Sequence, residues 1–301
     1  MLEIQLMIIL IIAVGYGITK AGMFSDKARA DLTNIVIYVV LPCNIFASFG
    51  GDISPEILRQ SGIILLVSFG LQGTYIILNK ILYRRFSPQR QAVLKYATIS
   101  NNAGFLGLPV IEAVFGPTGL LFGSIMLIPM RIFMWTSGLS LFTRTNTKEK
   151  VKTIATHPCI WAVILGFGYI FAPFTLPEFL GNTIAAIGRT TTVLAMLVVG
   201  SVLSGFEVKT ALDKDCFYYS FLRLIAIPAV MFGALRLLGV DPLVTGVAVL
   251  SAAMPAAVVT AMLAEKYGQD SEFASKTIFV STLLSIVTLP VIAAVLDIFI
   301  Q

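Results

Sequence analysis

The sequence contains few charged residues for its length. Charged side chains make up 12% of the 301 residues, hydrophobic ones make up 57%, and the mean hydropathy is +0.91. This composition excludes a soluble globular domain and calls for membrane spans. The Lys and Arg residues lie in short loops between apolar runs, and nucleic-acid binding would need them gathered on one surface. We therefore expect a lipid bilayer as partner and no nucleic acid.

Histidine and cysteine are also scarce. His157 is the single histidine, so a histidine metal cluster is excluded. The odd set of Cys43, Cys159 and Cys216 lies in or beside apolar runs, which is typical of small core residues rather than of disulfides. The sequence also has no evident nucleophile–base pair. We expect no metal, no cofactor and no enzymatic activity.

The apolar runs predict an all-α integral membrane protein with ten transmembrane helices. The expected spans cover residues 2–20, 29–49, 60–83, 91–115, 118–143, 158–173, 179–205, 216–238, 243–265 and 273–299. All the connections between them are short, and the longest, 144–157, is charged.

Basic residues predict the orientation of these spans. Sixteen of the 21 Lys and Arg residues fall within five segments on one predicted side, whereas the opposite side has only Arg59 and Arg236. Those five segments are 20–29, 80–95, 144–152, 209–214 and 266–276. By the positive-inside rule they face the cytoplasm, so both termini of this multi-pass protein lie outside.

An internal repeat is visible at an offset of 151 residues. Gly15 and Gly17 correspond to Gly166 and Gly168, and Ser100 corresponds to Ser251. Because each repeat holds an odd number of spans, the second must be inverted relative to the first. We expect a five-helix unit at 1–143, a cytoplasmic linker at 144–157 and an inverted five-helix unit at 158–301, together forming one transporter domain.

The segment 97–116, ATISNNAGFLGLPVIEAVFG, is poorly suited to a continuous helix. Three polar residues, 100–102, are followed by Gly104, Gly107 and Pro109. Glycine disfavours helix by about 1 kcal/mol relative to alanine and proline by about 3 kcal/mol. A break within the bilayer survives only beside protein or a water-filled cavity. Short polar side chains at such a break indicate a substrate site.

The repeat predicts a second break near residue 252. The segment 251–268, SAAMPAAVVTAMLAEKYG, begins with Ser251 and contains Pro255. Two broken helices of opposite direction can cross near the membrane midplane, where the N-termini of their half-helices bring partial positive charge to one point.

Three motifs carry a family resemblance: LPCNIFASF in the second span, SNNAGFLGLPVIEAVFG in the fourth and STLLSIVTLPV in the tenth. With them the sequence resembles the auxin efflux carrier family, which includes bacterial malonate and malate carriers and plant auxin exporters. The resemblance implies a 5+5 inverted repeat in which broken helices 4 and 9 cross. It also implies a scaffold of spans 1, 2, 6 and 7, a mobile bundle of the others, and elevator-type alternating access with a small carboxylate at the crossover.

The resemblance assigns site positions and a location. The residues that match the family's site are Asn101, Asn102, Gly104, Gly107 and Pro109 in the fourth span and Pro255 in the ninth. The short central loop is similar to the bacterial members, which implies the bacterial inner membrane. Val193 stands where the repeat would place a partner for Pro42, so the symmetry of the scaffold is incomplete. A homodimer is one option that the sequence leaves open.

Other polar residues inside the spans have open roles. Arg131 could attract an anionic substrate or bind backbone carbonyls, and Asn44 could face the site or bond to another helix. We expect Glu112 to reach interface water, Arg189 to extend outward and Arg223 to anchor an interface.

These observations favour a carrier of small organic anions, carboxylates above all. A proton- or sodium-coupled antiporter or symporter of related fold is the first alternative. It normally needs paired acidic residues in the core, and no Asp or Glu lies at the centre of a predicted span. A channel is a further alternative, which saturable uptake would distinguish from a carrier.

Overall fold

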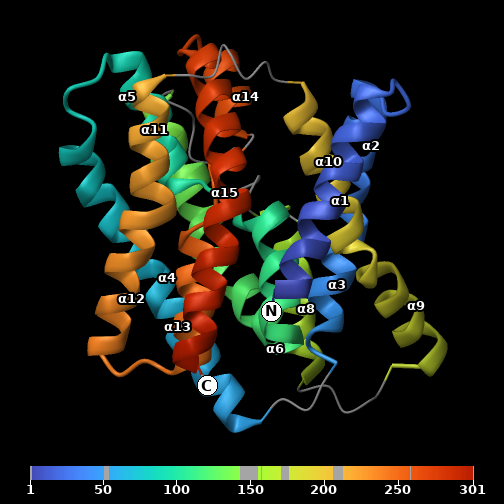
Figure 1. Cartoon of the computed structure of the whole chain (residues 1–301). Coiled ribbons are helices and arrows are strands. Elements are labelled where there is room, and N and C mark those ends of the chain that lie inside the picture. The colour runs from blue at the N-terminus through green and yellow to red at the C-terminus, as the bar shows by residue number, and fades with distance from the viewer. Residues whose placement is uncertain are drawn as a thin grey trace.

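The computed structural model describes residues 2–50, 54–142, 155–156, 158–170, 176–205, 213–257 and 259–300. These residues are helical or lie in short connections, and they form no strand. Their one isolated bridge is antiparallel and joins Asn101 to Ala256. Apart from residues 155 and 156, the linker expected at 144–157 lies outside the described residues. Figure 1 shows the helices running side by side in a bundle.

The helices of the first part of the chain follow the expected apolar runs. Their bounds are α1 Leu2–Lys20, α2 Asp26–Ile35, η1 Val36–Val40, α3 Leu41–Ala47, α4 Pro55–Leu82, α5 Pro88–Ile99, η2 Ala103–Gly107, α6 Leu108–Phe133, η3 Met134–Gly138 and η4 Leu139–Leu141.

The helices of the second part include the other expected break, between α13 and α14. Their bounds are α8 Pro158–Ile170, α9 Glu178–Arg189, α10 Thr191–Ser204, α11 Lys214–Phe221, η6 Leu222–Ala226, α12 Ile227–Leu237, α13 Pro242–Ala252, α14 Val259–Lys266 and α15 Ser271–Ile300.

Six helical stretches among the described residues are long and apolar enough to cross a membrane. They are Asp26–Ala47, Pro55–Leu82, Ala103–Leu141, Glu178–Ser201, Lys214–Leu237 and Ser271–Phe299. Three further apolar helices, Ile9–Lys20, Pro158–Ile170 and Pro242–Ala252, are shorter. The chain is therefore a multi-pass integral membrane protein.

Gly116 makes the turn between the expected fourth and fifth spans. Gly116 has φ 68° and ψ −164°, a conformation open to glycine but costly for other residues, and it divides α6 into two rods. Pro117 follows it at the start of the second rod, where a missing N–H costs nothing. The second rod packs back on the first, since Gly123 lies against the side chains of Leu108 and Ile111.

The helices form two groups. In the first, α1 packs against α10, and α3 packs against α8 and α9. In the second, α6 packs against α4 and α13, and α15 packs against α11 and α14. Figure 1 shows α2, α3, α9 and α10 on one side of the bundle and α4, α5, α11 and α12 on the other. The groups meet mainly through α6, η2 and α15.

Glycines set the closest approach within the first group. A Cβ on Gly200 of α10 would collide with the carbonyl oxygen of Ile12 in α1, and a Cβ on Gly15 would collide with that of Leu197. Gly17, two residues further along α1, would have open space around an added Cβ. The contact between α1 and α10 therefore depends on two backbones touching without side chains between them.

The substitution Gly200→Ala tests this contact. We expect it to destabilise the protein by about 1–3 kcal/mol, because backbone atoms cannot yield as a flexible side chain could. Gly17→Ala is the control and should leave stability unchanged or raise it slightly, since alanine favours helix. Thermal unfolding of the purified protein in detergent measures both. Equal melting temperatures for Gly200→Ala and wild type would contradict the contact.

Candidate functional site

The first interruption lies at residues 100–102, between α5 and η2. Ser100 has φ −111° and ψ 101°, and Asn102 has φ −83° and ψ 31°, so neither continues the helix. The Oδ1 atom of Asn101 accepts a hydrogen bond of 3.2 Å from the backbone N–H of Ala103. Asparagine side chains compete with helical hydrogen bonds in this way. The polar triplet thus locates the break.

The glycines and the proline of the motif lie just beyond the break. Gly104 and Gly107 belong to the π-helix η2, and Pro109 is buried in the first turn of α6. Because η2 runs without a gap into α6, Pro109 lies inside a continuous helix, where its missing N–H leaves a carbonyl one turn earlier without a helical partner. The break therefore falls several residues before Pro109.

The second interruption separates α13 from α14. The helix α13 ends at Ala252, and α14 begins at Val259. Pro255 lies between them, and Ser251 is the penultimate residue of α13. Both are buried.

The two interruptions bond to each other. The backbone N–H of Asn102 donates to the carbonyl oxygen of Pro255 at 2.8 Å. The side-chain Nδ2 of Asn101 donates to the carbonyl oxygen of Ser251 at 2.6 Å. From α15, the hydroxyl of Ser281 accepts the N–H of Ala256 at 3.2 Å. Each break therefore supplies polar partners that the other needs.

Arg223 also contacts both interruptions, and the interface-anchor prediction for it was wrong. Its side chain is only 1% exposed. The Nε atom donates to the carbonyl oxygen of Met254 at 3.1 Å, and Nη1 donates to that of Thr98 at 3.0 Å. One turn earlier, the Tyr219 hydroxyl donates to the carbonyl oxygen of Ala97 at 2.9 Å. The sequence motif alone did not reveal this residue.

Arg131 lies beside the restart of the first broken helix. The fold-back at Gly116 brings the second rod of α6 alongside η2. A Cβ on Gly104 would lie 3.3 Å from Nη2 of Arg131, so a guanidinium nitrogen reaches the first turn of η2. The Arg131 side chain is 8% exposed. A positive charge is thus placed where the helix N-terminus already carries partial positive charge.

A cavity of about 650 Å³ lies in front of the first interruption. Residues of α2, η1, α3 and α10 line one side, and residues of the interruptions, α6, η3 and α15 line the other. The polar lining residues are Arg29, Thr33, Asn34, Ser100, Asn101, Asn102, Arg131 and Thr282. Among the described lining residues there are two arginines and no Asp or Glu. The cavity therefore lies between the two helix groups and is positively charged.

The candidate site residues occupy different places around this cavity. Four of them line it: Asn101, Asn102, Gly104 and Arg131. Ser251 and Pro255 contribute carbonyl oxygens that hold Asn101 and Asn102. Gly107 and Pro109 are buried behind it, where a Cβ on Gly107 would lie 3.0 Å from the Cγ of Met254.

Asn44 lies apart from the cavity lining. Its Nδ2 donates a hydrogen bond of 2.7 Å to Oε2 of Glu112. Asn44 belongs to α3 in the first helix group and Glu112 to α6 in the second. Glu112 is half-buried and forms a bond between the groups, and the expectation that it reaches interface water stays a prediction. Arg189 is exposed, and its outward extension likewise stays a prediction.

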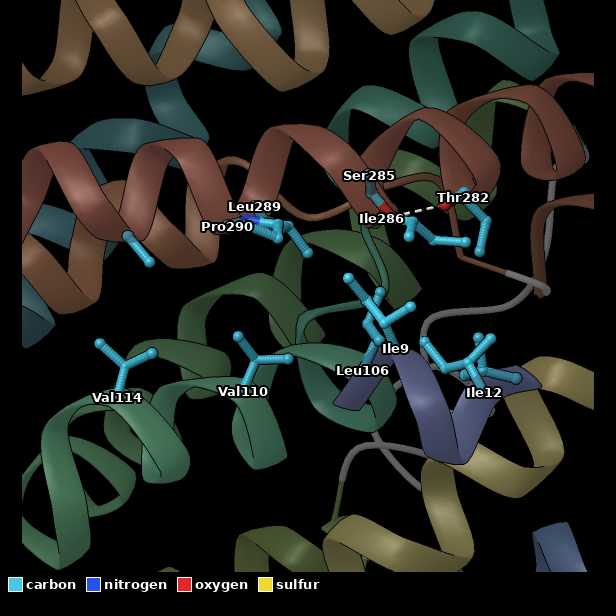
Figure 2. Close-up of a pocket in the computed structure, with 12 residues that line it drawn as sticks. Ile9, Ile12, Leu106, Val110, Val114, Thr282, Ser285, Ile286, Leu289 and Pro290 are labelled. Carbon is cyan, nitrogen blue, oxygen red and sulfur yellow. Dashed lines mark hydrogen bonds between the residues drawn. The ribbon is translucent and has the colours of Figure 1, made fainter. Parts of the chain in front are cut away.

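A second hollow, of about 30 Å³, lies along the same boundary between the groups. Figure 2 shows Val110 and Val114 of α6 pointing across it toward α15, with Ile9 and Ile12 of α1 at one end. The hydroxyl of Ser285 in α15 donates to the carbonyl oxygen of Thr282 in its own helix. The lining is almost wholly aliphatic, which suits neither an ion nor a polar ligand.

Comparisons with known proteins show a membrane transport protein. A family model described as membrane transport protein matches residues 1–156 and 150–293. An uncharacterized transporter of Methanothermobacter thermautotrophicus is 30% identical over 302 residues, which is 98% of each chain. One of Methanocaldococcus jannaschii is 25% identical over 298 residues, 96% of each chain. A Rhizobium meliloti protein named "Putative malonate transporter" is 25% identical over 300 residues, 92% of this chain and 90% of the relative.

Replacing Asn101 tests the bonding between the interruptions. Asn101→Ala removes the donor to Ser251 and the acceptor for Ala103, so we expect a loss of about 1–3 kcal/mol for each buried group left without a partner. Asn182→Ala, at an exposed position of α9, is the control. Thermal unfolding in detergent without substrate measures the difference. A melting temperature for Asn101→Ala equal to that of the control would argue against these bonds.

Proposed function

The chain belongs to the membrane transport protein family, which includes the auxin efflux carriers, and from this premise we propose that it carries small organic anions across the membrane. The supporting observation is the cavity between the helix groups, with Arg29 and Arg131 and no carboxylate among its described lining residues. An anion in such a space gains electrostatic energy that a cation would lose.

The proposed substrate contacts lie at the end of the cavity that reaches the interruptions. Asn102 and Gly104 line this end of the cavity, with the guanidinium of Arg131 beside Gly104. The first N–H groups of a helix have no partner within the helix; in η2 the N–H of Ala103 bonds to Asn101, so the N–H groups that follow it are the proposed donors to an anion. Arg131 adds a full charge at the same place. A carboxylate has the charge and the two acceptor oxygens for this set of donors.

The substrate class follows from the same chemistry. The cavity holds two guanidinium groups, Arg29 and Arg131, of which Arg29 is paired with Asp26 at 2.8 Å. A small mono- or dicarboxylate fits its volume, and one relative carries malonate in its name. Malonate is therefore the first compound to test.

We assign the transport movement to the boundary between the two helix groups, as an elevator-type displacement within a ten-span, 5+5 inverted architecture. The aliphatic hollow between α1, α6 and α15 supports this, since such side chains can slide without breaking hydrogen bonds. The second group would carry the crossed interruptions, and the first would stay fixed.

The direction in which the cavity opens is also part of the proposal. Its lining runs along α2, η1 and α3 from Arg29 to Leu41, roughly 18 Å at 1.5 Å per residue. Arg29 lies in a basic segment that the positive-inside rule assigns to the cytoplasm, and Figure 1 shows α2, α5 and α11 beginning at the same end of the bundle. The structure would then be an inward-open state of an inner-membrane carrier with both termini outside.

The bond between Asn44 and Glu112 would close the opposite side in this state. Asn44 lies about one turn beyond Leu41, the last cavity-lining residue of α3. The bond joins α3 to α6, one from each helix group. Movement of the second group past the first must therefore break it.

Arg131→Gln tests the anion site. We expect the concentration of malonate that gives half-maximal uptake into proteoliposomes to rise at least about tenfold, which corresponds to about 1.4 kcal/mol of binding energy. The cause is the loss of a charge beside the first turn of η2. Arg59→Gln, at an exposed position paired with Glu56, is the control for loss of charge alone. An unchanged half-saturation in Arg131→Gln would remove the arginine from the site.

A reversible cross-link tests the movement. In a background with Cys43, Cys159 and Cys216 replaced by alanine, the pair Asn44→Cys and Glu112→Cys should be joined by a short bis-methanethiosulfonate reagent, which spans the space of the two longer native side chains and is released by reduction. We expect the cross-linked protein to lose uptake, to keep its thermal stabilisation by malonate, and to recover uptake on reduction. Each single cysteine variant is the control for the reagent. Full uptake by the cross-linked protein would refute displacement at this contact.

A further inference from the structure

Arg223 is the most deeply buried of the described charged residues. It extends from the π-helix η6, is 1% exposed and lies deep between helices. A charge so far from water is costly in a membrane protein, so its contacts must compensate for the lost hydration. Three contacts do this: the two carbonyl bonds already described and the ring of Tyr75, whose centroid is 5.0 Å from the guanidinium carbon.

The two carbonyl groups that Arg223 binds belong one to each broken helix. Thr98 is the penultimate residue of α5, and Met254 lies in the second interruption, two residues beyond the end of α13. The last carbonyls of a helix have no partner within it and carry partial negative charge. One planar guanidinium therefore caps the end of α5 and at the same time holds the chain just beyond α13. The ammonium of lysine lacks the planar set of donors that lets one guanidinium bond to two carbonyl groups in fixed directions.

Arg223 does not line the cavity, but the chain segments that follow its two carbonyls do. Asn102 is the fourth residue after Thr98, and Ala257 is the third residue after Met254. Both endpoints line the cavity, and the bond from Asn102 to Pro255 joins the two segments. Any rotation of either helix end at Arg223 would move the amides that face the cavity.

We propose that Arg223 is a positioning residue of the anion site, acting through the carbonyl groups of Thr98 and Met254 to fix the two interruptions in register. The inference rests on the proposed function. It adds a specificity role, because Arg223 occupies a carbonyl at the negative end of α5 and one within the second interruption, and leaves the positive end at η2 to the substrate.

Three substitutions test the proposal. Arg223→Gln removes the charge and the two-pronged contact, Arg223→Lys keeps the charge alone, and Tyr75→Leu removes the ring while leaving both carbonyl bonds. We expect half-saturation for malonate uptake to rise at least about tenfold in Arg223→Gln and less in Arg223→Lys and Tyr75→Leu. Arg236→Gln, at an exposed position near the end of α12, is the matched control and should behave as wild type.

The outcomes separate positioning from general stability. A residue that only stabilises the fold would lower the melting temperature without substrate and leave half-saturation unchanged in the folded fraction, which would overturn the proposal. If Arg223→Gln does not fold, Arg223→Lys and Tyr75→Leu decide the question by the same shift in half-saturation.

Hydrogen exchange tests the role of Arg223 independently of transport. In Arg223→Lys without substrate, the amide of Asn102 should exchange faster than in wild type, because its bond to Pro255 is no longer held in register. If no carboxylate is transported or bound by wild type, the anion-carrier proposal fails while this result still reports on Arg223. Unchanged exchange at Asn102 would reject the positioning role directly.

Discussion

The need to satisfy backbone polar groups away from water governs this structure. Each helix interruption leaves N–H and C=O groups without helical partners, and in hydrocarbon each such group costs several kcal/mol. The chain resolves this by pairing the interruptions with one another, through Asn102 with Pro255 and Asn101 with Ser251. Because the partners are about 150 residues apart in the chain, neither break is stable until both parts of the protein have packed.

The same constraint explains why the site is polar at a single place. Carbonyls and amides that bond across the interruptions are no longer available to a ligand, whereas the first turn of η2 faces the cavity beside Arg131. The described polar residues in the aliphatic boundary formed by α1, α6 and α15 are Thr282 and Ser285, and the Ser285 hydroxyl bonds within its own helix. Binding and sliding can therefore use different parts of one boundary. The contact between Asn44 and Glu112 lies at a third place along it.

Much of this arrangement could be read from the sequence, because local chemistry determines it. The apolar runs predicted the helices, and the polar triplet at 100–102 predicted the first interruption. The repeat offset directed attention to Ser251 and Pro255. The motif's proline was less informative about position: Pro109 lies inside the continuous helix formed by η2 and α6, several residues beyond the break. Asn101 lies at the break itself, where its side chain accepts the N–H of Ala103.

Contacts between distant helices could not be read in this way. Arg223 lies near a predicted cytoplasmic end, where most arginines reach water, and only the packing of α5 and α13 around it makes it a buried cap. For Asn44 and Glu112 a usable signal existed. Both lie a few residues before the outer ends of their predicted spans, so a comparison of depth would have suggested the pair.

The placement of the two buried arginines also bears on the sign of the substrate charge. A carrier that binds cations at broken helices needs carbonyl oxygens at the C-terminal ends of the half-helices. Here the guanidinium of Arg223 bonds to the carbonyl of Thr98 near the end of α5 and to that of Met254 just beyond α13, so a positive charge already engages these two oxygens. Arg131 strengthens the positive field at the N-terminal end. One arginine engages carbonyl oxygens that a cation would need, and the other strengthens the positive charge at the start of η2. Both placements therefore favour an anionic substrate over a cationic one.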